Sequence, residues 1–219
     1  MTTPTTVDIL KYADLQMAAE ALLVNDDGSL KSDLKKALTE GNKHASKFTA
    51  PKADAFLAEW SVVAQRANTS SGFSGTLFKS NKTNEYVLSF RSTEFIDDAA
   101  RDNMATNTLE IKEIGYAWGQ LADMKAWYEE LSGAGGQLAG GRPFSVTGYS
   151  LGGHLATAFN LMYGAASQTV TFNGAGVGTY DRGTVELKDL VQQFSCPVSY
   201  DYTLVEAGHC SAQGIWRRD

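Results

Sequence analysis

Residues 144–162 read FSVTGYSLGGHLATAFNLM: an apolar run, a serine between two glycines, and a second apolar run. The first run is typical of a buried strand and the second of a helix. A serine on so sharp a turn must adopt a strained backbone conformation, and the flanking glycines let strand and helix approach closely. The five-residue pattern GYSLG alone would also suit a flexible turn. With its flanks, it predicts a nucleophile elbow, in which the Ser150 hydroxyl stands above the sheet edge and the next N–H can bind an oxyanion.

Composition and charge limit the classes of protein to which the chain can belong. Its 219 residues are enough for one domain with a sizeable core, and the 43% hydrophobic and 20% charged content is ordinary for a globular protein. A net charge of −6 and the absence of long basic runs argue against nucleic acid or an anionic membrane surface as a partner. No apolar stretch reaches the ~20 residues of a transmembrane helix.

Cysteines and acidic residues give no sign of a metal site. Cys196 and Cys210 could form a bridge in an oxidising compartment, but two cysteines are too few for a disulfide framework. Asp97, Asp98 and Asp102 match no calcium-binding loop, and a solvated acidic helix face is the simpler interpretation. We therefore expect no metal and no cofactor.

The first third of the chain has a helical character. Apolar residues recur close to every 3.6 positions and predict helices over 7–24, 32–38 and 53–66. The period changes after Gly72, and residues 73–80 and 86–91 are typical of two strands joined in a hairpin.

Strands and helices alternate in the rest of the chain. Besides the elbow, the predicted elements are a helix over 109–131, a strand over 168–172, a helix over 184–194 and a strand over 197–204. This alternation predicts an α/β fold with a mainly parallel sheet covered by helices. We expect a single domain over residues 1–219, with N-terminal helices in 1–70 and the catalytic sheet and helices in 71–219.

Three blocks of residues together resemble the class 3 lipase family of α/β-hydrolases. They are VLSFRST at 87–93, VTGYSLGGH at 146–154 and TFNGAGVG at 171–178. In that family the first block ends in an oxyanion-hole residue, the second is the elbow, and the third is the following strand and turn. The chain is also similar to catalytic regions of bacterial lipase or phospholipase proteins with calcium-binding repeats. The resemblance implies an α/β-hydrolase-like fold.

The same resemblance implies an activity and several site residues. Ser150 would attack a carboxylic ester of a lipid or a short acyl chain, and the backbone N–H groups of Thr93 and Leu151 would form the oxyanion hole. The segment after Thr93 would be a lid over the site, although an ordinary surface helix suits its composition equally well.

The base that activates the serine should be a histidine, and the chain has three. His44 precedes the sheet, and His154 lies on the helix directly after Ser150, from which it cannot easily reach over the hydroxyl. His209 follows the last predicted strand, in the order nucleophile, acid, base that the family shows. We therefore expect His209 to be the base.

The acid that orients the base is less well defined. The family places an aspartate in the loop after the strand that is 197–204 here, and no aspartate stands there. Asp201 lies within the strand and is our choice, with Glu206 at its end and Asp181 after the previous strand as alternatives. The family also has a longer segment between acid and histidine. The alternative function is therefore an impaired or inactive α/β-hydrolase module or fragment that binds a lipid or a partner protein.

The cellular location follows only in part from the sequence. The N-terminal residues MTTPTT lack the basic and apolar parts of a secretory signal. This leaves the bacterial cytoplasm, or secretion without an N-terminal signal peptide. Oligomeric state, acyl-chain length and head-group preference are not readable from the sequence.

Overall fold

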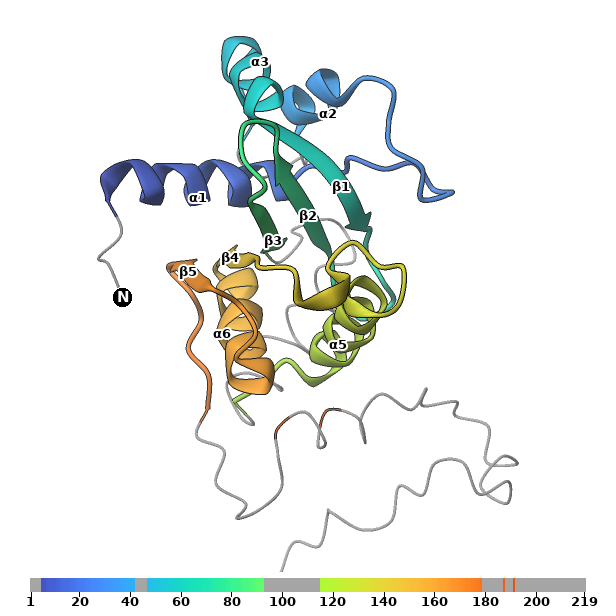
Figure 1. Cartoon of the computed structure of the whole chain (residues 1–219), viewed down its shortest axis with the longest axis vertical. Helices are drawn as coiled ribbons and strands as arrows, with labels where there is room; N and C mark the ends of the chain where they lie inside the picture. The colour runs from blue at the N-terminus through green and yellow to red at the C-terminus, as the bar shows by residue number, and fades with distance from the viewer. Residues whose placement is uncertain (1–4, 42–46, 93–114, 179–186, 188–190, 192–219) are drawn as a thin grey trace, which may run out of the picture.

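A mixed five-stranded sheet lies at the centre of the computed structural model, which describes residues 5–41, 47–92, 115–178, 187 and 191 (Figure 1). The strands are β1 (Trp60–Arg66), β2 (Gly75–Ser80), β3 (Tyr86–Phe90), β4 (Ser145–Tyr149) and β5 (Gln168–Phe172), in that spatial order. β1, β2 and β3 run antiparallel to one another, whereas β3, β4 and β5 are parallel. The predicted hairpin over 73–80 and 86–91 is confirmed by the β2–β3 pair.

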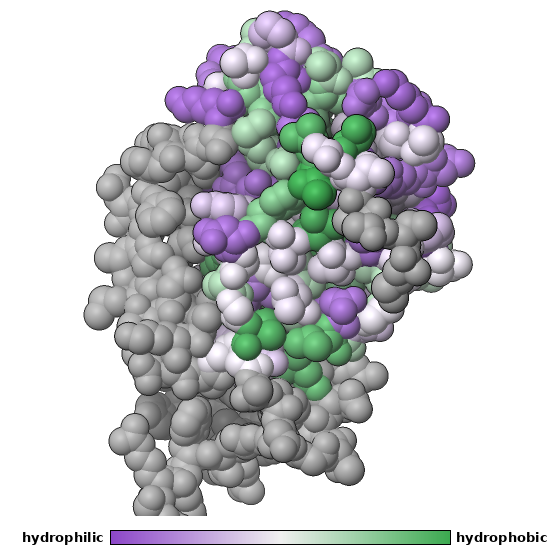
Figure 2. Space-filling model, turned by 90° about the vertical axis from the view of Figure 1, so that its left-hand side faces the viewer, coloured by the Kyte–Doolittle hydropathy of each residue, from purple (hydrophilic) through white to green (hydrophobic). Residues whose placement is uncertain are grey.

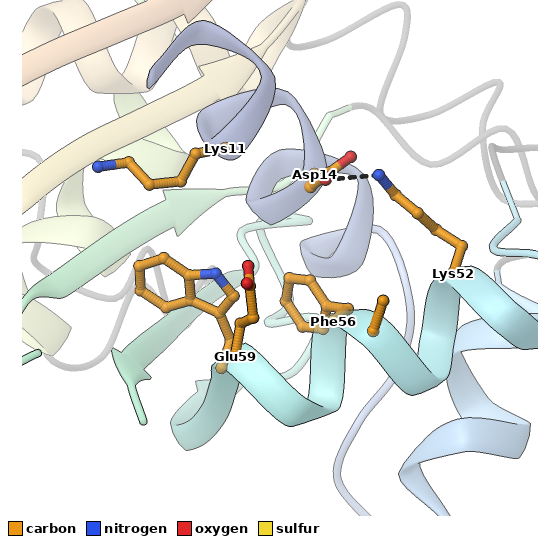
Figure 3. Close-up of a pocket in the computed structure, with 7 residues that line it drawn as sticks. Lys11, Asp14, Lys52, Phe56 and Glu59 are labelled. Carbon is orange, nitrogen blue, oxygen red and sulfur yellow. Dashed lines mark hydrogen bonds and ion pairs between the residues drawn. The ribbon is translucent and has the colours of Figure 1, made fainter. Parts of the chain in front are cut away.

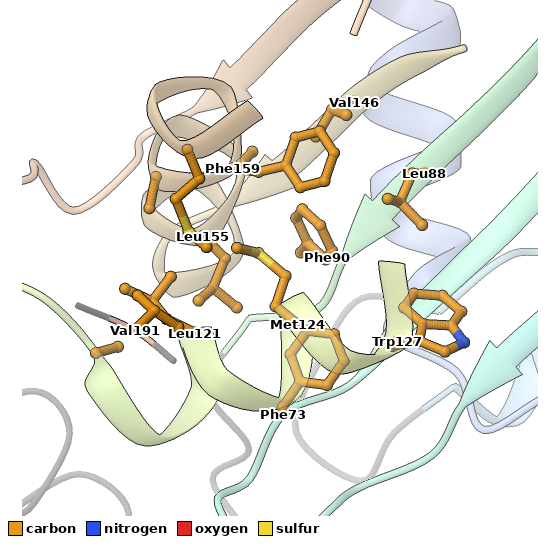
Figure 4. Packing of buried hydrophobic residues seen from close by; sticks show 14 of the residues in the cluster. Phe73, Leu88, Phe90, Leu121, Met124, Trp127, Val146, Leu155, Phe159 and Val191 are labelled. Atoms are coloured by element: carbon orange, nitrogen blue, oxygen red, sulfur yellow. The ribbon is translucent and has the colours of Figure 1, made fainter. Parts of the chain in front are cut away.

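Helices cover both faces of this sheet (Figure 1). The helices of the described residues are α1 (Thr6–Ala19), α2 (Leu34–Glu40), α3 (Ala50–Glu59), α5 (Trp118–Ser132), α6 (Leu151–Tyr163) and the short 3₁₀ turn η2 (Ala139–Gly141). Because side chains alternate along a strand, Val87 of β3 packs against the α1–α3 layer, and Leu88 and Phe90 pack against the α5–α6 layer. Figure 4 shows the core between the sheet and the α5–α6 layer, in which Phe90 lies between Phe159 of α6 and Met124 of α5.

The start of α1 is fixed by a reciprocal cap. The Thr5 hydroxyl accepts a hydrogen bond from the Asp8 N–H at 3.2 Å, and the Asp8 carboxylate accepts one from the Thr5 N–H at 2.9 Å. This capping box satisfies donors that the first turn leaves without an intrahelical partner. At its other end, α1 is followed by Glu20 as the C-cap residue.

The predicted helix over 53–66 is only half correct, and the sheet is less parallel than expected. α3 ends at Glu59, and the chain continues directly as β1, in which Trp60 and Val62 are buried while Ser61 is exposed. The spacing of the apolar residues here is compatible with a helix as well as with a strand, but the β-branched residues after Trp60 favour a strand once β2 offers an antiparallel partner.

The fold is α/β as predicted, with two antiparallel and two parallel strand pairs rather than a mainly parallel sheet.

The long helix predicted over 109–131 begins later than expected. α5 starts at Trp118, and Gly115 has a φ of +87°, which does not continue a right-handed helix. The Gly115 carbonyl accepts a hydrogen bond from the Gly178 N–H at 2.9 Å, so this turn lies beside the end of the third family-like block.

Parts of other predicted elements lie outside the described residues. The strand over 197–204 lies there entirely, and so do residues 109–114 of the helix predicted over 109–131 and most of the helix predicted over 184–194. Leu187 and Val191 from that helix are described, and both are helical and buried in the α5–α6 core. Among the residues that the structure describes, no helix is long and apolar enough to span a membrane.

Candidate active site

Ser150 occupies the turn between β4 and α6, with the strand, turn and helix that the sequence predicts on either side. Its backbone has φ 52° and ψ −117°, a combination that residues with a side chain rarely adopt. Such a conformation costs about 1–3 kcal/mol and persists only when the surroundings fix it, a property typical of functional sites.

Two glycines allow the close contacts that hold this turn. A Cβ atom on Gly148 would overlap the backbone of Gly152, and one on Gly152 would overlap the carbonyl oxygen of Phe90 in β3. Hydrogen bonds fix Ser150 from the third block as well: its N–H donates to the Phe172 carbonyl at 3.0 Å, and its carbonyl accepts from the Ala175 N–H at 3.1 Å. The strained conformation of Ser150 is therefore determined by three separate segments.

The N-terminus of α6 presents hydrogen-bond donors beside the serine. Leu151 is the first residue of α6, so its N–H has no acceptor within the helix. Within the described part of the chain, the Ser150 side chain makes no hydrogen bond that caps this helix. A helix N-terminus also carries partial positive charge. The geometry suits an oxyanion next to the Ser150 hydroxyl.

His154 is fully buried, and both of its ring nitrogens are already engaged. Nε2 accepts a hydrogen bond from the Ala117 N–H at 3.1 Å, and Nδ1 lies 2.9 Å from the Gly176 carbonyl, to which it must donate. Burial lowers the pKa of His154, and backbone hydrogen bonds at Gly176 and Ala175 oppose that shift in part. A neutral histidine with both nitrogens occupied has none left to accept a proton from Ser150.

The structure brings together only part of the predicted site. Ser150 and Leu151 stand side by side at the turn, whereas Thr93, His209 and Asp201 lie outside the described residues. The same holds for the alternative acids Glu206 and Asp181, for His44, for both cysteines and for the acidic residues between 97 and 102. In the described ranges, no group of three His, Cys, Asp or Glu side chains could hold a metal ion.

Sequence reasoning missed Glu20, a carboxylate that is 2% exposed at the end of α1. It binds Ser92, the last described residue before Thr93. The available signal is a single charged residue inside the apolar run MAAEALLV at 17–24, which marks a buried charge that needs partners.

Exposed apolar side chains occur beside the elbow and elsewhere. On the face shown in Figure 2, apolar side chains gather in small groups between polar ones. The large exposed apolar residues of the described chain are Val7, Ile9, Leu10, Leu30, Tyr149 and Leu161. Tyr149 directly precedes Ser150 and is 41% exposed.

A cavity of about 210 Å³ lies between α1, α3 and the start of β1 (Figure 3). It is lined by Lys11, Asp14, Lys52, Ala55, Phe56, Glu59 and Trp60. Its charges are paired within the protein: Lys52 with Asp14 at 2.6 Å, Lys11 with Glu85 at 2.7 Å, and Glu59 with Lys82 at 2.6 Å. No lining residue comes from β4 or α6. Each charged lining residue already has an ion-pair partner in the protein, so the cavity gives no sign of binding a charged ligand.

Comparison with known proteins gives only distant similarity. No protein-family model matches the chain, and no curated protein sequence matches it. Among solved structures, similarity is found to the Lip2 lipase from Yarrowia lipolytica (14% identity, TM-score 0.41, 78% of this chain and 59% of that one). A structure described as fungal lipases has 18% identity and a TM-score of 0.41, over 76% of this chain and 62% of that one. A mutant MDLA from Penicillium cyclopium has 15% identity and a TM-score of 0.37, over 78% of this chain and 63% of that one.

Two of these three structures are described as lipases, and the chain spans about six tenths of the length of each of the three. Overlap of this extent does not establish an activity for the chain. None of these findings bears on bacterial proteins with calcium-binding repeats, so that part of the resemblance stays a prediction.

Proposed function

We propose that the chain is a carboxylic ester hydrolase of the serine esterase or lipase type. The observation that carries this proposal is the conformation of Ser150, which three segments hold at positive φ between a buried strand and a helix N-terminus. Acyl transfer requires a nucleophile with a hydrogen-bond donor beside it. In the described part of the chain, the Ser150 hydroxyl does not cap α6, and the neighbouring Leu151 N–H has no acceptor within the helix. The class 3 lipase resemblance points to the same reaction.

In the proposed reaction, the Ser150 Oγ forms a bond to the acyl carbon of the ester. The N–H groups of Leu151 and Thr93 stabilise the oxyanion of the tetrahedral intermediate. His209 takes the serine proton and passes it to the leaving alcohol as the ester C–O bond breaks. Water then attacks the acyl-enzyme, and its proton returns through His209 to Ser150 as the acid leaves. No cofactor takes part.

The partners of Ser150 are assigned by order along the chain. The bonded state of His154 supports the choice of His209, because His154 has no ring nitrogen free to act as base. Asp201 is proposed as the residue that orients His209, with Glu206 and Asp181 as the alternatives. The substrate is proposed to be a lipid or a short acyl ester, with the exposed Tyr149 ring contacting its acyl part.

A p-nitrophenyl ester series of increasing acyl length tests this proposal. We expect turnover by the native chain, and a loss of roughly 10⁴-fold or more in Ser150→Ala and His209→Ala, because serine and base act as a unit. Ser145→Ala is the matched control, since Ser145 lies on β4 before the same elbow but is buried in the strand. Unchanged activity in His209→Ala would refute the choice of base. No turnover by the native chain would favour the inactive module that binds a lipid or a partner protein.

A further inference from the structure

We propose that Glu20 is a positioning residue for the ester hydrolysis proposed above. It lies at the end of α1 in the N-terminal segment, far in sequence from the elbow. Its carboxylate binds Ser92, two residues after the end of β3. The inference rests on the proposed function and extends the site to a helix on the opposite face of the sheet.

Both oxygens of the Glu20 carboxylate bind the same residue. Oε1 accepts a hydrogen bond from the Ser92 N–H at 3.0 Å, and Oε2 accepts one from the Ser92 hydroxyl at 2.8 Å. Gln16, one turn earlier along α1, donates to Oε1 at 3.2 Å. Two bonds to the backbone and side chain of one residue fix its orientation as well as its position, and charge-assisted bonds are stronger than neutral ones.

The carboxylate is buried together with a cation. The Glu20 and Arg91 side chains are 3% and 2% exposed, and Arg91 Nε lies 3.9 Å from Oε2. Arg91 also donates from Nη1 to the Asn68 side chain at 3.1 Å. A buried charge is tolerated only when paired and hydrogen-bonded, so replacing Glu20 would disturb every group that it binds.

The same end of β3 contacts the elbow on its other side. A Cβ atom on Gly152 would overlap the Phe90 carbonyl and come within 2.9 Å of the Arg91 carbonyl. Residues 90–92 therefore lie between the Glu20 carboxylate and the N-terminus of α6. β3 runs parallel to β4, with Phe90 opposite Gly148. The C-terminal ends of both strands therefore lie at the same end of the sheet, where Ser150 follows β4.

One peptide bond joins Ser92 to Thr93, the proposed second donor of the oxyanion hole. A donor helps only if it is aimed where the charge develops, and a displacement of about 1 Å can reduce the rate by about 100-fold. A change at Ser92 would therefore act on kcat, because the oxyanion forms in the transition state, and would leave KM nearly unchanged.

The test compares Glu20→Gln with Glu85→Gln in the full chain. Glu85 also binds α1, through Lys11 at 2.7 Å, but does not contact residues 90–92 in the described structure. We measure kcat and KM on a p-nitrophenyl ester and the rate of Ser150 labelling by a fluorophosphonate. Glu20→Gln should lower kcat and the labelling rate about 10- to 100-fold, with KM within about two-fold of native. Glu85→Gln should keep native values.

Ser92→Ala supplies a second, milder variant if Glu20→Gln fails to fold. It removes one of the two bonds to Glu20, so kcat should fall by a smaller factor. In the double variant, kcat should be no lower than in Glu20→Gln alone, because both changes act through the same contact.

The outcomes separate this inference from the proposed function. Native kcat in folded Glu20→Gln, or in Ser92→Ala, would overturn the inference alone, as would an equal loss of kcat in Glu85→Gln. If the native chain neither turns over the ester nor is labelled at Ser150, the proposed function fails, and this inference fails with it.

Discussion

The Nε2 atom of His154 accepts a hydrogen bond from the backbone N–H of Ala117 at 3.1 Å. Together with the bond from Nδ1 to the Gly176 carbonyl, this contact ties α6 to the segment before α5 and to the turn after β5. The Tyr116 ring and the imidazole also pack edge to face, with the ring centroids 5.9 Å apart. His154 therefore joins the segments around Ser150 as a neutral, buried group.

The first prediction concerns pH and the free energy of unfolding. Because burial lowers the pKa of folded His154, the unfolded chain takes up a proton at higher pH than the folded chain does. The contribution of His154 is complete above the unfolded pKa of about 6.5 and is lost as pH falls from there through the lowered pKa of the folded state. Urea unfolding at pH 7.5 and pH 5.5 should show lower stability at the acidic value.

His154→Gln provides the control for that pH effect. Glutamine does not titrate, so the difference in unfolding free energy between the two pH values should shrink in this variant. Its stability at pH 7.5 should fall by about 1–3 kcal/mol, since buried groups lose their hydrogen-bond partner. An equal pH dependence in His154→Gln and the native chain would show that His154 is not the titrating group.

How far the sequence predicts this molecule depends on how local each feature is. The elbow at Ser150 was predictable because its strand, turn and helix are contiguous, and because Gly148 makes its close contact with Gly152, four residues later. The strand starting at Trp60 was not, because its apolar residues suit a helical period too and the choice is made by pairing with β2. The bond from Glu20 to Ser92 joins residues 72 positions apart, and the partners of His154 are backbone groups. The charge of Glu20 inside an apolar run indicates burial, but the sequence does not show which residues Glu20 and His154 bind.

A second prediction concerns the close contact between α6 and β3. Gly152→Ala should destabilise the fold by about 1–3 kcal/mol, because the new Cβ overlaps the Phe90 carbonyl, a backbone atom that cannot rotate away. Gly119→Ala is the matched control: it lies within α5, where the added Cβ meets only the Ser71 Cβ at 3.4 Å. That variant should gain up to about 1 kcal/mol from helix propensity. Urea unfolding of both variants measures the contrast, and equal effects would contradict the tight packing at Gly152.

A third prediction concerns Tyr149, which is exposed beside the proposed nucleophile. If its ring contacts the acyl chain, Tyr149→Ala should raise KM for long-chain p-nitrophenyl esters about three- to ten-fold, because about 1 kcal/mol of apolar contact is lost. KM for the acetate ester should stay near the native value. Leu161→Ala is the control, since Leu161 is also exposed but lies near the far end of α6. An equal rise in KM for the acetate and the long-chain esters would argue against an acyl contact.

The last prediction uses the positive φ of Ser150 to separate stability from activity. Ser150→Ala keeps a Cβ atom and with it the backbone strain at φ 52°, whereas Ser150→Gly removes that strain. Both variants should lose turnover, because both lack the hydroxyl. The glycine variant should nevertheless be more stable than the alanine variant by about 1 kcal/mol. This difference is the backbone strain that glycine relieves in the folded state, minus the greater conformational entropy that glycine has in the unfolded chain. Parallel urea unfolding of the two variants measures this difference. A less stable glycine variant would mean that the turn holds Ser150 without strain, and the main structural support for a nucleophile at this position would be lost.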